Sequence, residues 1–107
     1  MVPLKPNISC KIGMVTMQNP VMTASGTFGY GQEFEPLMDL NRLGGIITKG
    51  LSLHPSPGNP APRIAETASG MLNAIGLENI GIDLFIKEKL PFLRRLQTTV
   101  WANIYGT

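Results

Sequence analysis

The sequence has 107 residues, of which 43% are hydrophobic and 15% are charged, and its formal net charge is +2. A chain of this size and composition forms at most one globular domain, and its scattered positive charges exclude a nucleic-acid-binding surface. No apolar run approaches the ~20 residues of a membrane span, the N-terminus has no signal-peptide pattern, and one cysteine, Cys10, excludes a disulfide framework and a cysteine-rich metal site. We therefore expect a cytoplasmic protein in which Cys10 is an ordinary strand residue.

The chain begins with a predicted β-hairpin and continues into a short strand. Residues 8–12 and 15–18 alternate in polarity and are joined by a Gly-Met pair, a pattern typical of two antiparallel strands with a tight turn. The apolar residues 21–24 then lead into residues 25–31, a glycine-rich stretch in which the backbone can turn sharply or approach a ligand closely. These patterns predict a strand followed by a loop.

The next predicted strand ends at a lysine. Residues 32–40 place apolar side chains near helical spacing, so we expect a short helix with Pro36 in an early turn. Residues 46–48 are all β-branched and follow two glycines, which predicts a strand buried on both faces. A helix between two strands is the βαβ unit, which makes the strands parallel. Lys49 then stands at the C-terminal end of the strand, either in a ligand site or simply exposed to solvent.

A long irregular segment follows. Residues 51–62 contain four prolines, which exclude a helix or a central strand and indicate a functional loop over the sheet. His54 is the only histidine and has no acidic or cysteine partner nearby, so we interpret it as a surface residue. Strand character returns at residues 63–67. Residues 69–79 are interpreted as an apolar loop, in which the Asn73 amide either binds a ligand or caps its own turn.

A helix and a third strand are predicted to complete the chain. The apolar face of this helix consists of Ile82, Phe85, Ile86, Leu90 and Leu93. Asn79 is expected to cap the N-terminus of the helix, and Pro91 is expected to kink or split it. Residues 99–106 are rich in β-forming side chains and predict a strand that ends near Asn103.

These elements predict an α/β fold that corresponds to the first part of a TIM (β/α)8 barrel, with about three strands preceded by a short β-hairpin. Each predicted strand end carries a polar residue, namely Ser25, Lys49 or Asn103. Such a rim suits an anionic or planar polar ligand. The sequence contains no Gly-x-Gly-x-x-Gly fingerprint, no Walker loop and no Ser/His/Asp set, and it indicates no metal site. The residues alone therefore identify no acid, base or nucleophile.

Four stretches stand out in register along the chain: residues 19–31 (NPVMTASGTFGYG), 48–52 (TKGLS), 57–67 (PGNPAPRIAET) and 71–77 (MLNAIGL). In order and spacing they closely resemble the N-terminal part of the class 1 dihydroorotate dehydrogenases. The Asn-Ala-Ile-Gly-Leu form is more similar to the class 1B, NAD-linked branch than to the fumarate-using class 1A branch. The membrane helix of the quinone-linked class 2 enzymes has no counterpart in the sequence.

The resemblance implies a flavoprotein of pyrimidine biosynthesis, an FMN-containing barrel and oxidoreductase that converts dihydroorotate to orotate. A hydride passes from the substrate to the flavin in this family. By motif match, the implied cofactor-binding residues are Ser25, Lys49, Gly50 and Asn103. The implied substrate-binding residues are Lys49, Asn73, Ala74, Ile75, Gly76 and Leu77. A lysine ammonium there would stabilise the negative charge that arrives with the hydride and would pair with the substrate carboxylate.

The resemblance also implies that part of the machinery lies beyond Thr107. The catalytic base of class 1 enzymes is a cysteine further along the chain, so we assign no catalytic residue here, and Cys10 does not match that motif. The phosphate-binding loops of a barrel follow its last strands. We therefore expect residues 1–107 to be the N-terminal part of one FMN-binding barrel domain, inactive alone. The NAD-linked branch further implies a homodimer joined to an electron-transfer subunit with FAD and an iron-sulfur cluster, in a heterotetramer.

Two other interpretations remain open. In the first, the chain is a non-catalytic fragment whose sheet edge pairs with a complementary chain. In the second, it is part of a related flavin barrel that reduces another pyrimidine. A cysteine-bearing active-site loop in the continuing reading frame would argue against the first alternative. Orotate binding would argue against the second.

Overall fold

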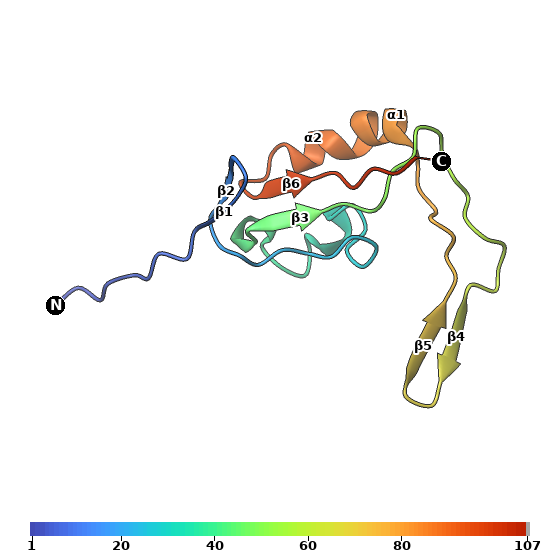
Figure 1. The fold of residues 1–107 in the computed structure, drawn as a ribbon, viewed down its shortest axis with the longest axis horizontal. Coiled ribbons are helices and arrows are strands. Elements are labelled where there is room, and N and C mark those ends of the chain that lie inside the picture. The colour runs from blue at the N-terminus through green and yellow to red at the C-terminus, as the bar shows by residue number, and fades with distance from the viewer. Residues whose placement is uncertain (107) are drawn as a thin grey trace.

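A computed structural model describes residues 1–106 (Figure 1). The strands are β1 (Cys10–Ile12), β2 (Val15–Met17), β3 (Gly45–Ile47), β4 (Ile64–Thr67), β5 (Gly70–Asn73) and β6 (Thr99–Trp101). The helical segments are the 3₁₀ turns η1 (Gln32–Phe34) and η2 (Leu40–Arg42), then α1 (Ile82–Leu84), the π turn η3 (Phe85–Lys89) and α2 (Leu90–Leu93). The strands pair as β1–β2, β3–β6 and β4–β5. Over the described range, no helix combines the length and the apolar character that a membrane span needs.

The parallel β3–β6 pair is the centre of the fold. β6 pairs with β3 along its whole length, and Met22 adds a parallel bridge to Gly45 at the other edge of β3. The predicted parallel direction is therefore confirmed for three segments. Residues 21–24 nevertheless form only this bridge and not the predicted strand. The Ile47 N–H donates to the hydroxyl of Thr23 at 3.0 Å, so a side chain takes the place of a ladder hydrogen bond.

A hydrophobic core joins β3 to the consecutive segments α1, η3 and α2, which together form one helical run. Ile46, in the middle of β3, has no exposed surface. The core cluster consists of Tyr30, Leu40, Leu43, Ile46, Leu51, Phe85, Phe92 and Leu93. Phe85 and Leu93 lie inside, as the helical pattern predicts. Ile86 was expected on the same face but is 52% exposed, so that part of the prediction is wrong.

Pro91 explains why Ile86 is exposed and does not pack in the core. A proline cannot donate a hydrogen bond to the carbonyl four residues earlier, and its ring crowds that carbonyl. The chain forms the π turn η3 just before Pro91 and then continues as α2. A π turn accommodates an extra residue in the helix, which rotates Ile86 away from the core. The helical run begins at Ile82, after Gly81, so the prediction that Asn79 caps it is wrong.

The single helix predicted over residues 32–40 is also wrong. The chain forms η1 and η2 instead, and between them the Phe34 carbonyl accepts two backbone hydrogen bonds. Pro36 supplies no N–H, so the regular series of helical hydrogen bonds stops after one turn. The Asp39 carboxylate then accepts the Asn41 N–H at 3.0 Å and begins η2.

β4 and β5 form an antiparallel hairpin that projects away from the β3–β6 body (Figure 1). Both the strand predicted over residues 63–67 and the hairpin of β1 and β2 are confirmed. Residues 69–79 were predicted to be a loop, but residues 70–73 form the strand β5, so this part of the prediction is wrong. All four residues of β5 are exposed. A four-residue segment that begins with glycine shows too little periodicity to be recognised, and its pairing with β4 decides its conformation.

Candidate functional site

The C-terminal ends of the parallel segments meet at a pocket of about 330 Å³. Its lining residues are Ser25, Gly26, Lys49, Gly50, Ile75, Leu77, Glu78, Asn103 and Tyr105. All four residues that the sequence assigned to cofactor binding are among them, although they come from three separate segments. Parallel strands bring their C-terminal ends to one edge of the sheet, which explains this convergence.

A short hydrogen-bond chain orients the polar side of the pocket. The Asn103 side-chain amide donates to the Ser25 hydroxyl at 2.7 Å, and that hydroxyl donates to the Thr48 carbonyl at 2.9 Å. Thr48 is fully buried, and its own hydroxyl accepts the Asn103 N–H at 3.3 Å. Ser25 and Asn103 are therefore held together by the end of β3.

Gly50 leaves an open surface on the same wall. A Cβ built on it would stand 3.4 Å from the Tyr105 ring and 3.6 Å from the Asn103 amide nitrogen. A methyl group would meet only ordinary van der Waals contacts there, but any longer side chain would project into the space between these two residues. The glycine therefore allows a flat ligand to lie close to the backbone.

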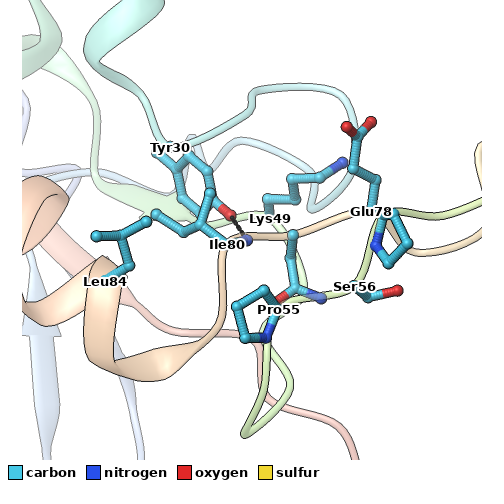
Figure 2. Close-up of a pocket in the computed structure, with 9 residues that line it drawn as sticks. Tyr30, Lys49, Pro55, Ser56, Glu78, Ile80 and Leu84 are labelled. Atoms are coloured by element: carbon cyan, nitrogen blue, oxygen red, sulfur yellow. Dashed lines mark hydrogen bonds between the residues drawn. The ribbon is translucent and has the colours of Figure 1, made fainter.

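Lys49 lies between this pocket and a second one of about 460 Å³. Figure 2 shows the second pocket, in which Lys49 and Glu78 extend along its wall. Among residues 1–106, the one ion pair within 4.0 Å joins Glu78 to Arg63 at 3.0 Å. The Lys49 ammonium thus has no carboxylate partner within this part of the chain, which leaves it available for an anionic ligand.

The stretch assigned to substrate binding reaches the pocket only in part. Ile75 and Leu77 line it, whereas Asn73, Ala74 and Gly76 do not. Asn73 is exposed at the end of β5, opposite Ile64, and so it is a strand residue and not the loop residue that was expected.

Asn59 anchors this stretch, a role that no pattern in the sequence predicts. Its side-chain amide donates to the Ala74 carbonyl at 2.9 Å, and its N–H donates to the Ile75 carbonyl at the same distance. Gly76 has a φ of 79°, and a Cβ there would be 2.6 Å from the Asn59 nitrogen. Position 76 therefore requires glycine. The only sequence signal for Asn59 is a polar residue among prolines.

A buried tyrosine ties the second pocket to the loop after position 77. The Tyr30 hydroxyl accepts the Ile80 N–H at 3.3 Å (Figure 2). Burial raises the pKa of Tyr30 above its ordinary value of 10.0, and the hydrogen bond from Ile80 offsets part of this increase. The neutral phenol is therefore the form that the fold favours.

This shift predicts a loss of stability in alkali. The contribution of Tyr30 is fully present below its ordinary pKa of 10.0 and is lost as the pH rises through the higher pKa of the folded state. We expect the absorbance difference between the wild-type chain and Tyr30→Phe to show phenolate formation with a midpoint above that ordinary value. A midpoint at or below it would contradict the effect of burial.

The sequence model of the dihydroorotate dehydrogenase family matches residues 7–107. The chain belongs to this family. It is 64% identical over 102 residues to a protein of Geotalea daltonii and 59% identical over 103 residues to one of Trichlorobacter lovleyi. Both relatives are named dihydroorotate dehydrogenase B (NAD(+)), catalytic subunit.

The aligned region covers 95% of this chain but 33% of the Geotalea protein, so the chain spans about a third of the length of such dihydroorotate dehydrogenases. The family resemblance drawn from the four motifs is confirmed by these matches. The relatives are also of the NAD-linked type that the Asn-Ala-Ile-Gly-Leu stretch indicates.

Proposed function

We propose that the protein containing this chain is a dihydroorotate dehydrogenase that oxidises dihydroorotate to orotate in pyrimidine biosynthesis. The observation that carries the proposal is the pocket in which Ser25, Lys49, Gly50 and Asn103 meet Ile75 and Leu77. Residues that the motif match assigns to the flavin and to the substrate thus line one space. Membership of the family supplies the reaction.

The residues of the pocket fit FMN. The Ser25 hydroxyl, the Asn103 amide and the Lys49 ammonium are hydrogen-bonding groups suited to the polar edge of a flavin ring. The bare backbone of Gly50, where a longer side chain would enter the pocket, suits the flat face of the ring. We propose that these four residues hold the ring of FMN.

In this proposal FMN, when bound, accepts the hydride that dihydroorotate loses. Lys49 binds the substrate carboxylate and places a positive charge where negative charge develops. By the motif match, residues 73–77 bind the substrate, although only Ile75 and Leu77 of this stretch line the pocket. The Asn73 amide would supply donors and an acceptor to the edge of the pyrimidine. We propose that the cysteine base and the phosphate-binding loops come from residues outside this sequence, since the chain spans about a third of its relatives.

The complete domain and its partner subunits are inferred from the sheet edges and from the names of the relatives. We propose that the parallel segments around β3 and β6 belong to a (β/α)8 barrel completed by the rest of the domain, because within residues 1–106 no further strand pairs with their outer edges. The relatives are named catalytic subunits, which supports the existence of a partner subunit. We propose that this partner is an electron-transfer subunit with FAD and an iron-sulfur cluster, in a cytoplasmic heterotetramer built from a homodimer of catalytic subunits.

The test is a chimera in which residues 1–107 replace the matching third of the Geotalea daltonii subunit, produced with the other subunits of that enzyme. We expect a yellow protein whose flavin absorbance is bleached by dihydroorotate, as in the parent enzyme. A chimera that holds flavin but is bleached only by a different pyrimidine would favour the related reductase. A colourless product would favour the non-catalytic fragment. The isolated chain is expected to retain no FMN and no activity.

A further inference from the structure

A buried amide lies directly behind the pocket. Asn79 is 5% exposed, and it follows the stretch assigned to substrate binding. Its side-chain oxygen accepts the Ser52 N–H at 3.2 Å and the Gly81 N–H at 2.9 Å. These two bonds attach Asn79 to the segment after β3 and to the start of the helical run.

The amide nitrogen of Asn79 reaches the pocket wall. It donates to the Leu77 carbonyl at 3.1 Å and to the Tyr105 hydroxyl at 2.9 Å. That hydroxyl in turn donates to the same Leu77 carbonyl at 3.1 Å. The Asn79 amide nitrogen also donates to the Ser52 hydroxyl at 2.9 Å. One carbonyl is therefore held by two side chains, and one of these belongs to the segment after β6.

Leu77 needs such a restraint. Its φ is 57°, the only positive value among the non-glycine residues that the structure describes. A branched side chain disfavours this conformation, which persists only where its surroundings enforce it. The Leu77 side chain is 64% exposed and lines the pocket together with Ile75. The restrained backbone thus determines which surface Leu77 presents.

We propose that Asn79 is a positioning residue for substrate binding, which together with Tyr105 clamps the Leu77 carbonyl and so sets residues 75–77 over the pocket. The inference rests on the proposed function, because it takes dihydroorotate as the ligand beneath this stretch. Asn79 does not line the 330 Å³ pocket itself, and its effect passes through Leu77.

The test compares Asn79→Asp with Tyr105→Phe in the chimeric holoenzyme. Aspartate keeps the acceptor of the Ser52 and Gly81 bonds but removes the amide nitrogen that donates to the Leu77 carbonyl and to the Tyr105 hydroxyl. We expect each variant to raise the KM for dihydroorotate and the Kd for orotate by about tenfold, the scale of one lost buried hydrogen bond. For Asn79→Asp, the kcat and the FMN content should change by less than about twofold, because Asn79 does not line the pocket and acts only through Leu77.

Asn41→Asp is the matched control. The Asn41 side chain also bridges distant segments, since its oxygen accepts the Gln97 N–H at 2.8 Å, but it does not line the pocket with Leu77. We expect its KM to equal that of the wild type. The double variant of Asn79 and Tyr105 should be no worse than the poorer single variant, because both act on one carbonyl.

Hydrogen exchange separates this inference from the proposed function. The amides of residues 75–78 should exchange faster in Asn79→Asp than in the wild type, whether or not the chimera oxidises dihydroorotate. Unchanged exchange there would overturn the clamp. An active wild-type chimera with an unchanged KM in both variants would also overturn it. An inactive wild type with faster exchange in the variant would contradict the proposed function and support the clamp.

Discussion

Replacing Lys49 by alanine is expected to slow dihydroorotate oxidation by roughly ten- to a thousandfold in the chimeric enzyme, the range seen when a preorganised electrostatic donor is removed. Lys49 follows β3 and lines the pocket with Ser25 and Asn103, and no carboxylate of residues 1–106 lies within 4.0 Å of its ammonium. Its charge is therefore available to the substrate and to charge that develops during the reaction. Stopped-flow measurement of flavin bleaching by dihydroorotate reports the rate.

Lys87→Ala provides the control for the loss of one positive charge. Lys87 is exposed on η3 and does not line the pocket of Lys49. We expect its bleaching rate to match the wild type. If Lys49→Ala also reacted at the wild-type rate with saturating substrate, Lys49 would have no role in the chemical step. A change in the apparent Kd alone would restrict it to binding the carboxylate.

Replacing Ile46 by alanine should have the largest effect on stability, with a loss of about 2–5 kcal/mol in the free energy of unfolding. Ile46 is fully buried in β3, and it packs in the cluster that includes Phe85 and Leu93. Alanine would leave a cavity between the sheet and the helical run, since the other residues of the cluster hold the two elements in place. The midpoint of urea denaturation of the chimera, followed by circular dichroism, measures the change.

Ile86→Ala is the matched control because the same side chain is lost from an exposed site. Ile86 is 52% exposed, and surface substitutions usually change stability by about 0.5 kcal/mol or less. Equal losses for the two variants would show that β3 is not the centre of the core. A larger loss for Ile86 would contradict the rotation that we attribute to the π turn before Pro91.

Local sequence patterns predicted the elements whose residues leave few alternatives. The β-branched run at β3 and the alternating arms of β1 and β2 appear as expected, because steric restriction and polarity act within each segment. The position of Lys49 after β3 also follows from the sequence. The roles of the pocket residues came from the motif match and stay predictions.

Other features depended on partners far away in the sequence. Thr23 replaces a ladder bond of Ile47, and β5 exists because β4 lies beside it. Pro36 and Pro91 have different effects. The helical hydrogen bonds stop near Pro36, whereas before Pro91 the helix forms a π turn and then continues. Proline disfavours a regular helix in both places, but the surrounding packing decides what forms instead.

Motifs and residue patterns were enough to predict the family, the parallel order around β3 and the residue types at its C-terminal end. The roles of Asn79 and Tyr105 depend on the folded chain, because the hydrogen bond between them joins residues 26 positions apart. The positive φ of Leu77 has the same origin. A leucine has no intrinsic preference for that conformation, so it arises only where contacts distant in sequence enforce it.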